Sequence, residues 1–116
     1  MNSEELKTRF KKFSLRIIKM VDHMPNTISG NAIAKQIVRS GTSPAANYRA
    51  ACVGKSDKDF LNKLKMVEEE LDETTHWLEI IRDSGMIQPE KLQDLLQESN
   101  ELYRIIVSSI VTLKAR

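Results

Sequence analysis

Two stretches decide the fold: Gln36–Tyr48, QIVRSGTSPAANY, and Asp59–Ile81, DFLNKLKMVEEELDETTHWLEII. The second stretch repeats apolar residues every three or four positions over about six turns, which predicts a long amphipathic helix. The first has helical flanks around Gly41 and Pro44. Because a proline inside a helix removes a backbone hydrogen bond, we expect a kink near Gly41–Pro44.

Capping and breaking residues extend this interpretation to the rest of the chain. A residue before proline avoids the helical region, so Pro25 ends the first helix. Ser56 and Asp59 approximate a capping box, Gly85 suits the residue after a helix, and Pro89 suits a first turn. The expected helices span about Ser3–Asp22, about Gly30–Ala51 with a disruption at residues 40–44, then Ser56 to just before Gly85, and Pro89 to about Leu113.

Each expected helix has one apolar face at helical spacing. The predicted core residues are Leu6, Phe10, Phe13, Ile17, Met20 and Met24, then Ile33, Ile37 and Val38, then Phe60, Leu64, Val67, Leu71, Thr74, Leu78 and Ile81, then Leu92, Leu95, Leu96, Ser99, Leu102, Ile106, Ile110 and Leu113. Short connections make neighbouring helices antiparallel. The sequence therefore predicts an all-α, up-down-up-down four-helix bundle in a single domain, residues 1–116.

Composition indicates a cytoplasmic protein. The chain has 116 residues and one cysteine, so an internal disulfide is excluded and a reducing compartment is expected. The acidic start, MNSEEL, does not resemble a secretory signal. The longest apolar stretch, Ile105–Leu113, is too short to cross a bilayer, and we expect no membrane contact.

The formal net charge of +2 hides an uneven distribution, because Lys and Arg dominate up to about residue 65 and Asp and Glu dominate after it. Opposite charges on different helices can attract one another within the bundle. They can also serve contact with an acidic partner, or packing between copies of the chain. The sequence leaves these alternatives open.

Six basic residues are candidates for nucleic-acid binding. The first helix carries four of them at 3-4-3 spacing on a side away from its apolar face, and two more in the second helix are four residues apart. Such stripes bind phosphates in a salt-dependent way without reading bases. The candidates are Arg9, Lys12, Arg16, Lys19, Lys35 and Arg39.

Three helices carry apolar residues outside their core faces. A monomeric bundle needs about one apolar stripe per helix, so additional apolar lines favour a homo-oligomer, although scattered surface apolar residues are also normal. The interface candidates are Leu15, Ile18, Met66, Trp77, Ile80, Ile105 and Val111.

Catalytic and metal sites find little support. Glu73-x-x-His76 resembles half of a di-iron motif, but a second such pair is missing and both residues point away from the predicted core. Phosphate-loop, dinucleotide and zinc spacings are also missing. We therefore expect no enzyme activity, no metal and no cofactor.

Several short motifs resemble a family of small bacterial four-helix-bundle proteins. This family includes proteins encoded in 23S ribosomal RNA intervening sequences and the accessory variability proteins of diversity-generating retroelements. The motifs are Arg39-Ser40-Gly41-Thr42-Ser43, Ala46-Asn47-Tyr48, Asp59-Phe60 with Lys63-Leu64, and Glu70-x-x-Glu73-Thr74-x-x-Trp77-Leu78-Glu79.

The resemblance implies a bundle that assembles into a homopentamer and has no catalytic activity. Its retroelement members imply nucleic acid, RNA or DNA, and a reverse transcriptase as partners. At the expected kink, polar side chains could satisfy backbone groups or reach the third helix, and a buried Arg–Glu contact there would fix the register of the helices. This structural polar cluster comprises Arg39, Ser40, Thr42, Asn47, Glu70 and Glu73.

The leading hypothesis is thus a non-enzymatic, oligomeric helical bundle that binds nucleic acid or an RNA–protein assembly through basic surfaces. The alternative is a protein-binding, self-assembling scaffold whose charge distribution serves assembly.

Overall fold

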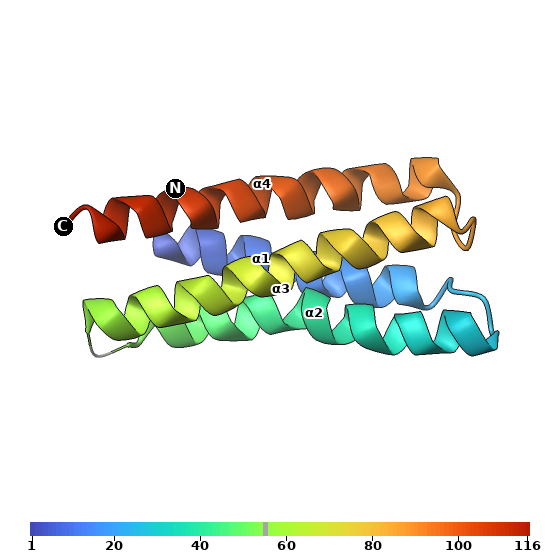
Figure 1. The fold of residues 1–116 in the computed structure, drawn as a ribbon, viewed down its shortest axis with the longest axis horizontal. Coiled ribbons are helices and arrows are strands. Elements are labelled where there is room, and N and C mark those ends of the chain that lie inside the picture. Colours follow the sequence, from blue (N-terminus) through green and yellow to red (C-terminus); the bar gives the residue numbers. More distant parts are fainter. Residues whose placement is uncertain (55) are drawn as a thin grey trace.

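A computed structural model describes residues 1–54 and 56–116 of the chain. Its four helices are α1 (Ser3–Val21), α2 (Ile28–Cys52), α3 (Asp57–Asp83) and α4 (Pro89–Lys114). They run alternately up and down along a bundle of 47 × 21 × 20 Å, and both chain termini lie at the same end (Figure 1). The predicted all-α, up-down-up-down four-helix bundle is confirmed.

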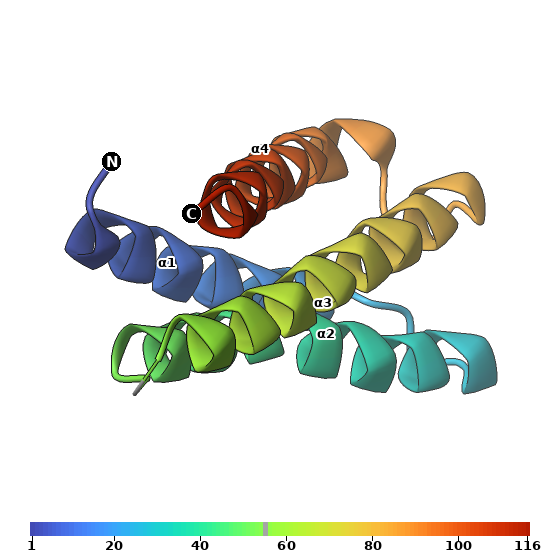
Figure 2. The same ribbon diagram turned by 60° about the vertical axis from the view of Figure 1, so that its left-hand side comes forward.

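The helices pack in chain order. α2 lies against both α1 and α3, α3 lies against α4, and α1 meets α4 over a smaller region. In the turned view, α2 and α4 lie on opposite sides of the molecule (Figure 2). In the described part of the chain, we find no helix with the length and apolar character needed to cross a membrane.

Helix ends follow the predicted capping signals. The Ser56 hydroxyl accepts a hydrogen bond from the backbone N–H of Asp59 (3.1 Å) at the start of α3. Gly85, with φ of 77°, follows the end of that helix, and the Met86 N–H donates to the Ile81 carbonyl (3.1 Å). This is the pattern of a Schellman C-cap, which requires a residue with positive φ. Pro89 occupies the first turn of α4.

The start of α2 differs from the prediction. Thr27 is the N-cap, and its hydroxyl accepts a hydrogen bond from the Gly30 N–H (3.0 Å). The helix therefore begins at Ile28, slightly earlier than the start near Gly30 expected from the sequence. The signal that the sequence analysis missed was Thr27 itself, which is a favourable N-cap residue even without the acidic partner of a capping box.

The interior of α2 is continuous. Gly41 and Pro44 lie inside one uninterrupted helix, so the helix continues through the disruption expected at residues 40–44, and the kink of its axis near them stays a prediction. Both residues are buried. A Cβ on Gly41 would lie 2.9 Å from the side-chain carbons of Ile17, so the glycine permits a close approach of α1 and α2.

The core agrees with most of the predicted faces, although Val38 is only partly buried, and Tyr48 and Ile87 belong to the core without having been predicted. Its largest fully buried side chains come from every helix: Phe10, Phe13, Ile17, Ile37, Leu64, Val67, Leu71, Leu78, Ile81, Leu92, Leu102 and Ile106. Buried hydroxyls are paired between helices, with Thr74 donating to Ser40 (3.0 Å) and Thr75 sharing a hydrogen bond with Ser99 (2.8 Å). These pairs explain why polar residues occur on apolar faces.

Candidate nucleic-acid interface

Arg9, the first basic candidate, is held by two glutamates of α4. Its Nε and Nη2 donate to the two carboxylate oxygens of Glu98 (2.8 and 2.7 Å), and Nη2 also donates to Glu101 (2.7 Å). The hydrogen bonds from Arg9 hold the pKa of Glu98 below its usual range. We call Arg9, Glu98 and Glu101 the Arg9 cluster. Its guanidinium serves a contact within the chain, so it is a poor candidate for binding phosphate.

Arg39, the last basic candidate, reaches two glutamates of α3. Its Nη1 donates to Glu70 (3.0 Å), and its Nη2 donates to Glu73. Glu73 also accepts a hydrogen bond from the Trp77 indole (3.1 Å). Burial tends to raise the pKa of Glu73, but the hydrogen bonds from Arg39 and Trp77 outweigh it, so the pKa is lowered.

This second set, the Arg39 cluster of Arg39, Glu70 and Glu73, forms the Arg–Glu contact expected from the sequence. The expectation that it is buried is wrong, because the side chain of Arg39 is 51% exposed. Two other members of the predicted polar cluster do not join it. Thr42 donates to the Val38 carbonyl (2.6 Å), and Asn47 donates to Ser43 (3.0 Å), so both side chains bond within α2.

Three basic candidates of α1 remain. Lys12, Arg16 and Lys19 are exposed, and within residues 1–54 and 56–116 they take part in no ion pair. They follow Arg9 at helical spacing, and Arg9 contacts α4, so the stripe lies on the α4 side of α1.

Lys35 lies elsewhere on the molecule. It is exposed and precedes Arg39 by one turn, and Arg39 faces α3. The six predicted basic residues therefore do not form one surface. Lys12, Arg16 and Lys19 lie on the α1–α4 side. Arg9 and Arg39 are each ion-paired in a separate cluster, and Lys35 lies on the side of α2 that carries Arg39.

A basic pocket lies between the C-terminal half of α1 and the start of α4. Its cavity volume is about 430 Å³. Arg16 and Lys19 line it from α1, and Lys91 and Asp94 line it from α4. His23 lies beside them and donates from Nδ1 to the Lys19 carbonyl (3.0 Å), since a carbonyl oxygen can only accept.

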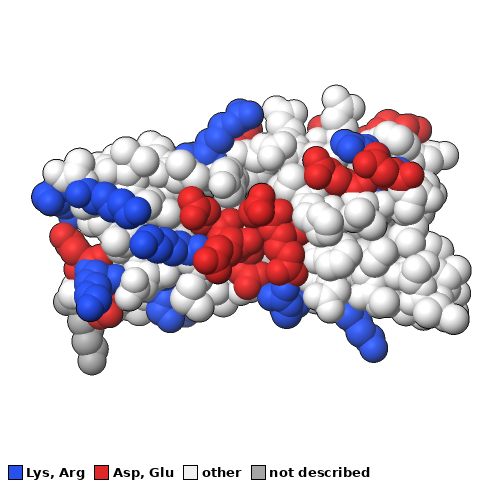
Figure 3. Space-filling view, in the orientation of Figure 1, with Lys and Arg blue, Asp and Glu red and all other residues white. Residues whose placement is uncertain are grey.

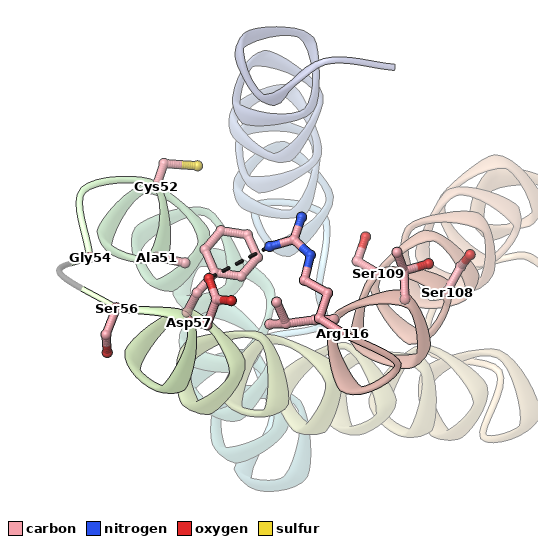
Figure 4. Close-up of a pocket in the computed structure, with 11 residues that line it drawn as sticks. Ala51, Cys52, Gly54, Ser56, Asp57, Ser108, Ser109 and Arg116 are labelled. Atoms are coloured by element: carbon pink, nitrogen blue, oxygen red, sulfur yellow. Dashed lines mark ion pairs between the residues drawn. The ribbon is translucent and has the colours of Figure 1, made fainter.

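A second pocket, of about 600 Å³, lies where the α2–α3 turn approaches the end of α4 (Figure 4). Arg116 forms an ion pair with Asp57 there (3.6 Å), so these charges cancel. The Ser109 hydroxyl donates to the Ile105 carbonyl (3.0 Å) and is thereby occupied. This pocket lacks the positive charge that would attract a phosphate.

The face centred on α3 is acidic. Figure 3 shows acidic side chains gathered over the middle of this helix, where the sequence has Glu68, Glu69, Glu70, Asp72 and Glu73. α1 lies behind α3 in the same orientation (Figure 1). A polyanion would be repelled by the α3 face and attracted by the α1–α4 side.

The predicted interface residues fall into two groups. Leu15, Ile18, Met66, Ile80 and Val111 are exposed. Trp77 and Ile105 are partly buried and pack against the core of their own chain, which accounts for their apolar character without a partner.

The half-motif Glu73-x-x-His76 has a structural explanation. Glu73 is engaged by Arg39 and Trp77, and His76 lies against the Trp77 ring at a centroid distance of 4.9 Å. Among the described residues, no group of three or more His, Cys, Asp and Glu side chains is placed to hold a metal ion.

The sequence interpretation missed the α4 half of this region. Glu98 and Glu101 belong to the Arg9 cluster, while Lys91 and Asp94 line the basic pocket. Each pair is spaced three residues apart on α4, and the two pairs are seven residues apart, so all four lie on one side of the helix. That spacing was the available signal.

Comparison with known proteins gives a consistent result. The sequence model of the family described as 23S rRNA-intervening sequence protein matches residues 5–108. No curated protein sequence matches significantly. A crystal structure of a protein with unknown function from the S23 ribosomal protein family of Bacteroides thetaiotaomicron is 33% identical, with a TM-score of 0.85. The match covers 90% of this chain and 97% of that chain.

Proposed function

This chain belongs to the family of 23S rRNA-intervening sequence proteins, and from that premise we propose that it is a non-enzymatic, oligomeric bundle that binds nucleic acid. RNA, or an RNA–protein assembly, is the expected ligand. The α1–α4 side is the proposed binding surface.

The observation that carries this proposal is the state of three cations on α1. Lys12, Arg16 and Lys19 are exposed on one side of the helix and form no ion pair in the part of the chain that the structure describes. Arg9 and Arg39, by contrast, are neutralised by glutamates. The proposed surface is therefore smaller than the sequence suggested, and it is confined to one side of the molecule.

Oligomerisation belongs to the same proposal. A few phosphate contacts per chain bind weakly, and repeating them in an assembly raises the effective concentration of sites. Exposed apolar side chains on α1 and α3 (Leu15, Ile18, Met66 and Ile80) support burial between subunits. Replacing Ile18 with Glu should reduce the mass measured by light scattering after size exclusion, whereas a monomeric wild type would contradict this part of the proposal.

The binding proposal is tested with a fluorescent single-stranded RNA of about 30 nucleotides, by anisotropy at several salt concentrations. Affinity should fall steeply between about 50 and 200 mM salt, because binding releases counterions. The double variant Lys12→Glu/Arg16→Glu should lose most of the affinity.

The matched control is Lys58→Glu/Arg104→Glu, which changes net charge equally at two exposed positions outside the α1 stripe. The control should keep most of the wild-type affinity. Equal losses in the two variants would mean that only net charge matters, and the proposed surface would be wrong.

The alternative is a scaffold that assembles and binds proteins without nucleic acid. The separation of the acidic α3 face from the basic side of α1 favours it, because these two surfaces could meet between copies. It predicts an oligomer that dissociates with salt and binds no RNA at about 50 mM salt. A stable oligomer without any RNA binding would select this alternative.

A further inference from the structure

The basic pocket occupies the position at which the Arg9 cluster would repeat. Seven residues are about two helical turns, so Arg16 lies on the same side of α1 as Arg9. On the antiparallel α4, the corresponding step from Glu98 and Glu101 leads back to Lys91 and Asp94. Where Arg9 forms ion pairs with two carboxylates, Arg16 shares the pocket lining with one carboxylate and one ammonium group.

This replacement leaves positive charge uncompensated. Arg16, Lys19 and Lys91 line one cavity, and Asp94 is the carboxylate among its lining residues. In the described residues none of the three cations forms an ion pair. Glu98, which lies close enough for Arg16 to lower its pKa, already accepts two hydrogen bonds from Arg9.

Apart from His23, the remaining lining of the pocket is apolar. Met20, Ile87 and Leu95 belong to the core and also line the cavity, and we call them its apolar floor and the charged lining residues its rim. A volume of about 430 Å³ falls in the range of small-molecule sites, which combine apolar walls with a few convergent polar groups. A simple inorganic anion would use the rim and leave the apolar floor without a partner.

We propose that this pocket binds a nucleoside phosphate unit. Arg16, Lys19 and Lys91 contact the phosphate, and the apolar floor receives the base. Asp94 accepts hydrogen bonds from the ribose hydroxyls, a role that explains a carboxylate within a cationic site. The unit is either a free nucleotide or an unpaired nucleotide of an RNA strand, and in the second case the inference rests on the proposed function.

The test is a titration of the full-length protein with AMP, inorganic phosphate and adenosine, followed by NMR of the backbone amides around the pocket. AMP should bind about tenfold more tightly than phosphate or adenosine alone, because it engages rim and floor together. Deoxy-AMP should bind more weakly than AMP in wild type, and Asp94→Asn should reduce that difference.

Lys91→Glu should abolish AMP binding, with Lys58→Glu as the matched control, an equal charge reversal at an exposed lysine outside the pocket lining. Equal affinities for phosphate and AMP would overturn the proposal, and so would AMP binding that survives Lys91→Glu. Unfolding curves of Lys91→Glu and wild type should coincide, since Lys91 is exposed. If they do not coincide, Lys91→Ala replaces it in the same titration.

A short single-stranded RNA distinguishes the two sources of the nucleotide. If the RNA competes with AMP and loses affinity in Lys91→Glu, the pocket holds a nucleotide of the strand. If AMP binds but no RNA does, the pocket binds a free nucleotide and the proposed function fails. If RNA binds, AMP does not, and Lys91→Glu leaves RNA affinity unchanged, the pocket proposal fails alone.

Discussion

Two arginines in this bundle make the same contact with different surroundings. Arg9 joins α1 to Glu98 and Glu101 of α4, and Arg39 joins α2 to Glu70 and Glu73 of α3. In both clusters the two glutamates are three residues apart. The Arg9 side chain is 26% exposed and that of Glu98 is 15% exposed, whereas Arg39 is 51% exposed.

The helices joined by the two clusters also differ. α2 and α3 already pack closely beside the Arg39 cluster, where Thr74 donates to Ser40. α1 and α4 meet over a smaller region, so Arg9 supplies a larger share of their contact. The same three-residue arrangement should therefore stabilise the α1–α4 pair more than the α2–α3 pair, because partial burial weakens solvent screening.

The largest expected effect is that of Arg9→Met. The change leaves two neighbouring carboxylates without their cation, one of them mostly buried, and should cost on the order of 1–3 kcal/mol of unfolding free energy. Urea denaturation followed by circular dichroism measures it. Arg39→Met is the matched control and should cost less. Equal losses would show that exposure does not distinguish the two clusters.

A smaller effect is expected from acid. The Arg9 hydrogen bonds lower the pKa of Glu98 below its ordinary value of 4.5, so the folded state favours the ionised carboxyl. The resulting stability is complete above the ordinary pKa and is lost as pH falls through the lowered one. The stability difference between wild type and Arg9→Met should thus narrow below about pH 4.5. A difference that stays constant down to about pH 3 would contradict this assignment.

The smallest effect concerns the Arg39 cluster, which has an optical reporter. Trp77 is the single tryptophan, and its indole N–H donates to Glu73. The excited indole loses electron density from its pyrrole ring, so a nearby carboxylate stabilises that state. Glu73→Gln should shift the emission to shorter wavelength with little change in stability, as fluorescence spectra would show. Arg9→Met should leave the emission unchanged in the folded protein.

The two clusters also show what the sequence could predict. The contact of Arg39 with Glu70 and Glu73 was expected because all three belong to motifs of the family that the chain resembles. Arg9 was instead assigned to a solvent-facing stripe, since nothing local indicates that residue 9 meets residues 98 and 101. Both contacts join a base from the first part of the chain to acids from the second. Part of the uneven charge distribution is therefore used within the bundle.

Helix caps show the same division between local and tertiary information. Ser56, Gly85 and Pro89 act through neighbours a few residues away, and their roles were predicted correctly. The continuity of α2 through Gly41 and Pro44 depends on burial against other helices, which overrides the local preference for a break. The basic pocket was likewise missed because it needs the register of two helices that are distant in the chain.

Gly41 has a consequence that reaches beyond its own contact. Because it lacks a side chain, Ile17 seats directly on the α2 backbone, which fixes the angle at which α1 is rotated about its long axis. Each residue accounts for about 100° of that rotation, so even a modest turn of α1 would carry Arg9 away from Glu98 and Arg16 away from Lys91. Gly41, on α2, thus sets the direction in which the charged side chains of the neighbouring helix α1 point.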